Sequence, residues 1–258
     1  MKRFLLLLIL LVGCTSADIN TEIKLDNGDY LVEGSQTAFL LTHGLAASPY
    51  EVKNLADYLI EKNFTVQVVR LAGHGTSLDD LRRTKWEEWY KSYEDAFLEL
   101  SKDKRVYVGG TSLGALIALH LAENHNTAGV ISLAAPLHLN DKKAKYAWIF
   151  KYLQKYADRE LTEEEGPYYY PTFPVASVAE MVEIARITEK NLDQITEPVL
   201  VMQFSNDTRV STESPEIIYN NIASEKKLLV LVNGTDHVLT MGPKKEYVFE
   251  KINQFISK

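Results

Sequence analysis

The sequence predicts one α/β domain built on a mostly parallel, doubly wound sheet, and three observations lead to this prediction. The chain has 258 residues, which is enough for one large core and short for two independent domains. Short continuous apolar runs of strand length recur along it, and helical segments separate most of them. Strands that are apolar on both faces are typical of a parallel sheet that helices cover on both sides.

The predicted elements alternate along the chain. Asn27-Gly28 is a turn signal between two short alternating segments, so a β-hairpin is expected there. Buried strands are then predicted at 38–42, 64–70, 106–110, 128–134, 198–204 and 227–232. Helices are predicted at 50–62, 85–100, 113–124 and 244–256. Ser48 followed by Pro49 is a typical start for the first of these helices.

The segment at about 136–197 interrupts this alternation because it contains no predicted strand. The sequence predicts helices at 141–161 and 176–195, around a proline- and tyrosine-rich loop at 166–174. An insertion of about sixty residues is longer than an ordinary crossover between neighbouring strands. We therefore expect a small helical cap above the ends of the strands.

The first residues do not belong to this domain. Lys2 and Arg3 precede the apolar run Phe4–Val12, which is too short to span a bilayer and is typical of an export signal. The run ends in Leu11-Val12-Gly13-Cys14, which resembles the lipobox of bacterial lipoproteins, where cleavage before the cysteine leaves a lipid-bearing N-terminal residue.

Cys14 is the only cysteine, so it has no partner for an internal disulfide, and lipidation would account for its position. An ordinary signal peptide with an incidental cysteine is the alternative. With lipidation, the product is an exported lipoprotein anchored to a membrane of the cell envelope. The expected boundaries are a signal peptide at 1–13, a tether at 14–22 and the domain at 23–258.

The charge of the chain limits its partners. The formal net charge is −7, so no nucleic-acid partner is expected. An acidic body does not favour an anionic lipid surface either. The acyl chains on Cys14, rather than a basic patch, are therefore expected to hold the protein at the membrane.

Gly110-Thr111-Ser112-Leu113-Gly114 lies where a predicted strand becomes a predicted helix. In the pattern G-x-S-x-G a sharp turn holds the serine in a strained conformation, and the flanking glycines remove Cβ atoms that would clash. The following helix directs its first N–H groups toward the reacting centre. The turn is interpreted as the mount of a nucleophile, with a tight packing turn as the alternative.

A serine nucleophile needs a base and an acid that orients the base. Asp207 follows one late strand and His237 follows the next, so both are expected at the edge of the sheet that carries Ser112. We expect His237 to take the Ser112 proton and Asp207 to hold the His237 tautomer. Asp236, adjacent to His237, is the weaker alternative, because neighbours on a loop seldom orient each other's rings.

Acyl transfer also needs donors for the developing oxyanion. The backbone N–H of Leu113 comes with the turn, and the loop after strand 38–42 would present the N–H of Leu45. A simple glycine turn before a helix is the alternative for that loop. His74, in a second glycine-rich loop, is assigned no chemical step.

Five segments, in this order, resemble the α/β-hydrolase fold and, within it, the bacterial carboxylesterase and monoacylglycerol lipase group: LLTHGLAASP, RLAGHGT, GGTSLG, FSNDTRV and NGTDHVLT. The resemblance spans about 38 to 257. It implies a triad of Ser112, Asp207 and His237, with Leu45 and Leu113 as oxyanion donors. It also implies ester hydrolysis through an acyl-serine intermediate, with no cofactor and no metal. Ser205-Asn206 departs from the pattern, because such enzymes often have a glycine before the acid.

The expected substrates are carboxylic esters, either short- to medium-chain acyl esters or monoacylglycerols. Aryl (feruloyl-type) esters or thioesters are alternatives on the same triad, and a lipoprotein that only binds ligands is a third hypothesis. Aromatic side chains in the cap could line an acyl pocket or simply dock the cap onto the body. They form two groups: Tyr146, Trp148, Phe150 and Tyr152, and Tyr168, Tyr169, Tyr170 and Phe173.

Overall fold

The computed structural model describes residues 28–161, 163–166 and 168–257. The predicted signal peptide, Cys14, the tether and the first arm of the predicted hairpin lie outside these residues. Within the described residues, no helix is both long and apolar enough to cross a membrane.

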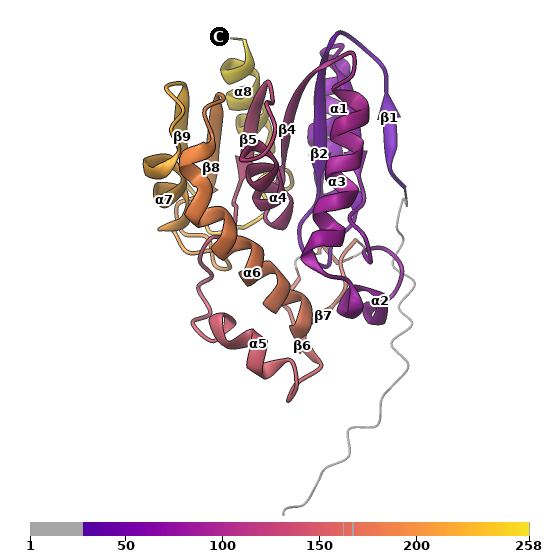
Figure 1. The fold of residues 1–258 in the computed structure, drawn as a ribbon, viewed down its shortest axis with the longest axis vertical. Coiled ribbons are helices and arrows are strands. Elements are labelled where there is room, and N and C mark those ends of the chain that lie inside the picture. The colour runs from indigo at the N-terminus through magenta and orange to yellow at the C-terminus, as the bar shows by residue number, and fades with distance from the viewer. Residues whose placement is uncertain (1–27, 162, 167, 258) are drawn as a thin grey trace, which may run out of the picture.

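A seven-stranded sheet in the order β1-β3-β2-β4-β5-β8-β9 forms the centre of the molecule (Figure 1). Its strands are β1 (Tyr30–Val32), β2 (Thr37–Thr42), β3 (Thr65–Val69), β4 (Arg105–Thr111), β5 (Gly129–Leu133), β8 (Val199–Phe204) and β9 (Lys227–Val232). Every neighbouring pair is parallel except β1 and β3, where Tyr30 pairs with Val68. The mostly parallel sheet and its six predicted strands are therefore confirmed, and β1 is an antiparallel edge strand on β3. The expected burial holds for five of the six strands, because β9, at the opposite edge, is only partly buried.

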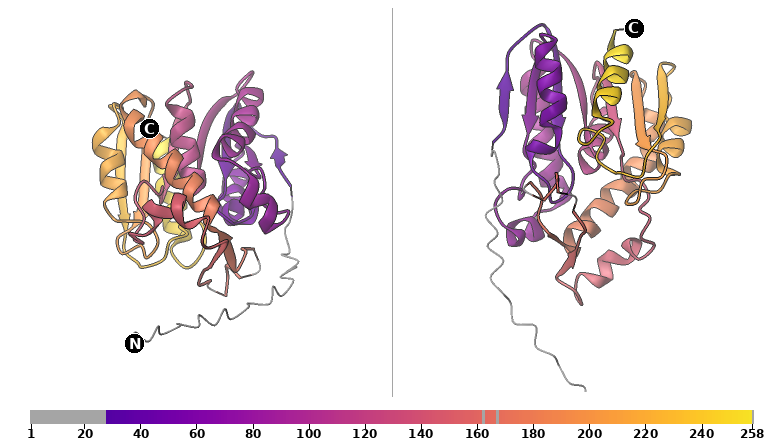
Figure 2. Two further views of the ribbon diagram at one scale, coloured as in Figure 1. Left: turned by 60° about the horizontal axis from the view of Figure 1, so that its bottom comes forward. Right: turned by 180° about the vertical axis from the view of Figure 1, so that it is seen from behind.

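Helices cover both faces of the sheet. On one face lie α1 (Lys53–Glu61), which follows the 3₁₀ turn η1 (Pro49–Val52), and α8 (Lys245–Ile256). Figure 2 shows both in its right-hand view. On the other face lie α3 (Trp86–Leu100), α4 (Leu113–Ala122), α6 (Val175–Asn191) and α7 (Ser214–Asn221). The short helices α2 (Leu78–Arg83) and α7 are additions to the predicted pattern.

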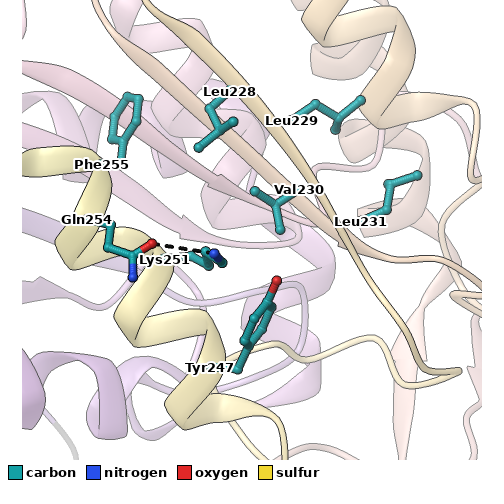
Figure 3. A pocket seen from close by; sticks show the side chains of 8 residues that line it. All are labelled: Leu228, Leu229, Val230, Leu231, Tyr247, Lys251, Gln254 and Phe255. Atoms are coloured by element: carbon teal, nitrogen blue, oxygen red, sulfur yellow. Dashed lines mark hydrogen bonds between the residues drawn. The ribbon is translucent and has the colours of Figure 1, made fainter. Parts of the chain in front are cut away.

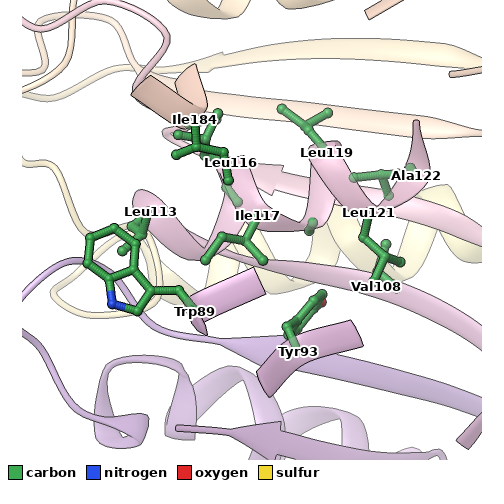
Figure 4. Close-up of a cluster of buried hydrophobic side chains, with 14 of the residues drawn as sticks. Trp89, Tyr93, Val108, Leu113, Leu116, Ile117, Leu119, Leu121, Ala122 and Ile184 are labelled. Atoms are coloured by element: carbon green, nitrogen blue, oxygen red, sulfur yellow. The ribbon is translucent and has the colours of Figure 1, made fainter. Parts of the chain in front are cut away.

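Helix α4 is buried on every side, as expected for a helix that is hydrophobic all round. It packs against β4 and β5, while α3 and α6 cover its outer side (Figure 4). Trp89 and Tyr93 of α3 and Ile184 of α6 are fully buried against it. The helix that follows Ser112 is therefore fixed in the core, which holds the turn before it in place.

The first half of the cap differs from its prediction, and the second half matches it. The predicted helix 141–161 is wrong beyond residue 150: the structure has the 3₁₀ turn η2 (Ala144–Tyr146), the short α5 (Ala147–Phe150) and then β6 (Tyr156–Asp158). β6 pairs antiparallel with β7 (Thr172–Pro174), so the expectation of no strand in the cap is also wrong. The predicted helix 176–195 is confirmed as α6, which continues into η3 (Leu192–Gln194).

Contacts across the fold hold the start of β6, in the part of the cap where the predicted helix is absent. Lys155 Nζ lies 2.9 Å from Asp79 Oδ1, and the Tyr156 hydroxyl donates to the same oxygen at 3.1 Å. Asp79 belongs to α2, on the body of the molecule. Tertiary contacts of this kind override the helix propensity of a short segment.

Candidate active site

Ser112 lies between the end of β4 and the start of α4, at the sharp turn that the glycine pattern predicts. Its backbone has φ 54° and ψ −118°, a left-handed conformation that residues other than glycine rarely adopt. Such strain persists only where the surroundings impose it, and it is the conformation expected of a nucleophile presented on a strand-to-helix turn.

Gly110 and Gly114 are required by the close approach of β2. A Cβ atom at either position would overlap the carbonyl oxygen of Thr42, the last residue of β2. The turn and the loop after β2 are thus packed backbone to backbone, which accounts for both glycines.

Replacing Gly114 with alanine should therefore destabilise the protein by about 1–3 kcal/mol, the usual cost of forcing extra atoms into a packed interior. The free energy of unfolding in urea measures this. Gly28→Ala is the matched control, because a Cβ at Gly28 meets nothing within 4 Å. Equal stability of the two variants would contradict the packing explanation.

Asp207 and His237 form a buried pair at the carboxyl ends of β8 and β9. His237 Nδ1 and Asp207 Oδ2 are 2.8 Å apart, and the two residues are 7% and 4% exposed. Asp207 Oδ1 accepts the backbone N–H groups of Arg209 at 2.8 Å and Val210 at 3.0 Å. Both carboxylate oxygens are therefore held, whereas Asp236 is exposed. The geometry selects Asp207 as the partner of His237.

The hydroxyl of Ser112 makes no hydrogen bond to the other described residues, His237 included. Catalytic hydrogen bonds are often long in a free enzyme and tighten when substrate binds. Ser112 is half-buried, and its Cβ lies 3.2 Å from where a Cβ on Gly44 would be. Ser112 therefore faces the loop after β2.

This loop carries the predicted oxyanion donor Leu45. Within the described structure, neither the N–H of Leu45 nor that of Leu113 donates to another residue, and Leu113, as the first residue of α4, has no acceptor within its own helix. The positive φ of Ala46, 55°, turns the chain sharply after Leu45. The loop also leads into η1, so the alternative interpretation, a turn before a helix, is confirmed, while the role of Leu45 as an oxyanion donor stays a prediction.

His43, in the loop after β2, is buried and uses both ring nitrogens for contacts with backbone groups. Its Nδ1 lies 2.9 Å from the carbonyl oxygen of Gly44, and its Nε2 accepts the backbone N–H of Leu71 at 3.3 Å. This pattern assigns the proton to Nδ1. Burial lowers the pKa of His43 to about 4, so the ring is neutral at pH 7. His74 packs edge-on against it, which is consistent with a structural role for His74.

Glu51, in η1, is a buried charged residue that the sequence analysis missed. Its carboxylate accepts the backbone N–H of Gly44 and, at 2.5 Å, the hydroxyl of Tyr169 from the cap. The hydroxyl of Thr240, three residues after His237, donates to its backbone carbonyl oxygen. Burial raises the pKa of the Glu51 carboxyl. Glu51 thus joins the oxyanion loop, the cap and the His237 loop.

Replacing Glu51 with alanine should lower the free energy of unfolding by about 2–4 kcal/mol, because the N–H of Gly44 and the hydroxyl of Tyr169 would lose their acceptor while buried. It should also lower kcat at least about tenfold, since a displaced oxyanion donor is costly. Glu51→Gln keeps an acceptor and should retain most of both. Glu61→Ala, at the exposed end of α1, is the control. Wild-type stability in Glu51→Ala would contradict this role.

Two arginines tie the cap to the same loops. Arg159 Nη1 donates to the carbonyl oxygen of Leu45 at 3.2 Å, and its guanidinium lies over the ring of Tyr169, 4.9 Å from the ring centroid. Arg209, two residues after Asp207, forms an ion pair with Glu165 of the cap at 2.9 Å. The cap is therefore anchored to both sides of the site.

The two groups of cap aromatics behave differently. Tyr169 and Tyr170 are buried against the body, Tyr168 stacks on Tyr50, and Phe173 packs against the core. The second group therefore docks the cap, which was one of the two interpretations. The first group neither docks the cap onto the body nor lines an enclosed acyl pocket, because its side chains are exposed to solvent.

A groove on the far edge of the sheet lies apart from these residues. It is formed by β9 and α8, with Tyr247, Lys251 and Phe255 on the helix side (Figure 3). None of the proposed catalytic side chains lines it, so we assign it no chemical role. Among the described residues, no group of three or more histidine, cysteine, aspartate or glutamate side chains is placed to hold a metal ion.

Comparison with known proteins identifies the family. Residues 34–244 match the serine aminopeptidase S33 family of hydrolases. The chain belongs to this family. The match takes in the turn of Ser112 and the loops of Asp207 and His237, so the S33 family assignment covers the whole proposed site.

Two curated relatives are named as ester-cleaving enzymes. A carboxylesterase of Bacillus subtilis (strain 168) is 27% identical over 89% of this chain and 96% of its own. A thermostable monoacylglycerol lipase of Bacillus sp. (strain H-257) is also 27% identical, over 89% of this chain and 94% of its own.

Solved structures share the fold. One from a study of LipS and LipT, two metagenome-derived lipolytic enzymes, has a TM-score of 0.84 and 24% identity over 89% of this chain and 97% of its own. The monoacylglycerol lipase of Paleococcus ferrophilus has a TM-score of 0.76 and 17% identity, with coverage of 89% and 98%. The α/β-hydrolase fold of this S33 family member is confirmed.

Proposed function

We propose that this protein is a serine carboxylesterase that cleaves acyl esters through an acyl-serine intermediate. The observation that carries the proposal is the buried Asp207–His237 pair at the strand ends, on the edge where the strained turn presents Ser112. The curated relatives named carboxylesterase and monoacylglycerol lipase support ester cleavage.

The chemistry follows from the positions of these groups. With Nδ1 of His237 bonded to Asp207, its Nε2 is the nitrogen left to take the proton of the Ser112 hydroxyl as the oxygen attacks the ester carbonyl. The N–H groups of Leu45 and Leu113 stabilise the oxyanion. His237 then returns the proton to the leaving alcohol. Water, activated by the same ring, releases the acid and restores the serine.

The substrates proposed are short- to medium-chain acyl esters or monoacylglycerols. Because the family is named after an aminopeptidase, the test compares bond types as well as chain lengths. We expect p-nitrophenyl butyrate and a monoacylglycerol to be cleaved, and an amino-acid p-nitroanilide to be cleaved far more slowly. Methyl ferulate and an acyl thioester in the same panel test the two alternatives. Preferred cleavage of the anilide would overturn the proposal.

We further propose that the protein is an exported lipoprotein held to a membrane of the cell envelope through Cys14. The support is the sequence alone: the basic start, the apolar run and the cysteine at its end. Mass spectrometry of the N-terminal peptide isolated from a bacterial host should find a diacylglyceryl group on Cys14. An unmodified Cys14, or cleavage elsewhere, would overturn this proposal.

A further inference from the structure

The outer surface of the cap carries a concentration of exposed apolar side chains. We call it the cap patch; its members, with the exposed fraction of each, are Tyr146 (48%), Trp148 (61%), Ile149 (42%), Phe150 (38%), Tyr152 (81%) and Leu153 (78%). Of the other large exposed apolar side chains of the described structure, Leu31 of β1 and Leu98 of α3 stand alone, and the remaining three line the groove between β9 and α8: Leu228, Leu231 and Tyr247. The cap patch holds six of these side chains within eight consecutive residues, and a concentration of exposed apolar surface marks an interaction surface, whereas single exposed side chains need no explanation.

In the sequence, lysines flank the cap patch and are interleaved with it, although the chain as a whole is acidic. Between Asp141 and Asp158 the only other charged residues are five lysines, in a chain of formal net charge −7: Lys142, Lys143, Lys145, Lys151 and Lys155. Only the last of these forms a salt bridge, with Asp79. Tryptophan and tyrosine interleaved with lysine are the composition of surfaces that lie at the interface of a bilayer. The stretch 142–157 is therefore positively charged in a chain that is acidic as a whole.

The N-terminal end of the described chain lies at the same end of the sheet as the cap. Because β1 is antiparallel to β3, it begins where the parallel strands end (Figure 1). Asp29, just before β1, accepts the backbone N–H of Arg70 after the last residue of β3, at 2.6 Å. The sixteen residues from Cys14 to Asp29, fifteen steps along the chain, reach at most about 54 Å when fully extended, a span that allows a lipid on Cys14 and the cap patch to meet one membrane.

We propose that the cap patch docks on the surface of an anionic lipid bilayer and turns the Ser112 edge of the sheet toward the membrane. Aromatic and leucine side chains enter the interface, and the free lysines bind anionic headgroups. The substrates favoured by this orientation are ester lipids presented by the bilayer. That last consequence rests on the proposed function, whereas the docking itself does not.

A second copy of the chain fits this surface less well. A symmetric dimer through the cap patch would place the patch against itself and bring the lysines of both copies together. Like charges at such a contact are unfavourable, while an anionic lipid surface neutralises them. The charge pattern therefore favours lipid as the occupant.

Trp148 allows the contact itself to be measured, whatever holds the N-terminus at the membrane. Full-length protein is mixed with phosphatidylcholine vesicles, with or without phosphatidylglycerol, whose acyl chains carry bromine as a fluorescence quencher. We expect strong quenching with the anionic vesicles, and loss of most of it in Trp148→Phe, which keeps Trp86 and Trp89. Trp148 fluorescence that stays unquenched on anionic vesicles would overturn the proposal.

A double variant, Tyr152→Ser with Leu153→Ser, tests the consequence for activity. We expect kcat/KM for a monoacylglycerol in anionic vesicles to fall about tenfold, as apolar contact with the interface is lost. Hydrolysis of dissolved p-nitrophenyl butyrate should stay unchanged. Leu98→Ser, which removes an equally apolar side chain that is 46% exposed on α3, should change neither activity.

The outcomes separate this proposal from the esterase assignment. Quenching of Trp148 without hydrolysis of any ester would overturn the proposed function and leave the docking standing. Full hydrolysis of vesicle substrate by the double variant would overturn the orienting role. Sedimentation that shows dimers of the wild type and monomers of the double variant, with Trp148 unquenched, would assign the cap patch to a second copy instead.

Discussion

Ser112→Ala should lower kcat for ester hydrolysis by on the order of a million-fold, the loss found when the nucleophile of a serine triad is removed. The variant should stay folded, because Ser112 is half-buried at the surface of the site and its hydroxyl bonds to no other described residue. Hydrolysis of p-nitrophenyl butyrate, measured beside the thermal unfolding midpoint, checks both expectations. A stable variant with wild-type kcat would remove Ser112 from the mechanism.

Asp207→Asn should lower kcat by about 10⁴-fold while leaving the fold intact, because an amide in place of the carboxylate favours the wrong tautomer of His237. Asp236→Asn is the matched control: it changes the aspartate next to His237 in the chain, which is exposed. The control should keep kcat within about twofold, as surface substitutions usually have small effects.

The ratio of these two variants decides which aspartate orients the histidine. A large loss in Asp236→Asn, with little loss in Asp207→Asn, would contradict the 2.8 Å contact between His237 Nδ1 and Asp207 Oδ2 as the functional one. Measuring kcat across pH for both variants adds a second readout, because the tautomer and charge of His237 control the reaction.

The parallel sheet was predictable because each central strand is a short apolar run, and residues buried on both faces leave that mark in the sequence. The positions of Asp207 and His237 followed from the same mark, since each comes just after such a run. To predict that the two side chains pair, it was enough to know that the carboxyl ends of parallel strands meet at one edge of a sheet.

The first half of the cap could not be predicted in the same way. Its helical periodicity is real over α5, but Lys155 and Tyr156 bind Asp79, which lies far away in the sequence. The extended conformation there is held by contacts that no local pattern encodes, including the β6–β7 pairing. The exposure of Trp148 and Tyr152 could not be predicted either, because the sequence pattern is the same for an aromatic residue that packs on the body and for one that faces solvent.

Glu51 and Arg159 were missed because a charged residue in a sequence is expected at the surface. Glu51 is buried and Arg159 is half-buried because their partners come from other segments: Gly44 and Tyr169 for Glu51, and the carbonyl oxygen of Leu45 for Arg159. A glutamate two residues after Pro49, on the first turn behind a catalytic loop, is the one local signal that could have drawn attention to it.

Contacts from the cap reach the loops on both sides of the proposed active site. Tyr169, Arg159 and Glu165 join the cap to the loops of Leu45 and Asp207, so the part of the chain that faces the proposed membrane surface is also joined to the oxyanion loop. The acidic net charge alone had favoured attachment by acyl chains only. In the docking that we propose, the lysines flanking and interleaved with the cap patch add an electrostatic contribution to the acyl chains.

The central claim is that Ser112 becomes acylated during turnover. Treating the full-length protein with a fluorophosphonate and mapping the adduct by mass spectrometry tests it most directly, because this reagent traps an activated serine. We predict one adduct, on the peptide that contains Ser112, together with loss of ester hydrolysis, and no adduct in Ser112→Ala. An adduct on another residue, or an unlabelled Ser112 in protein that still hydrolyses esters, would contradict the claim.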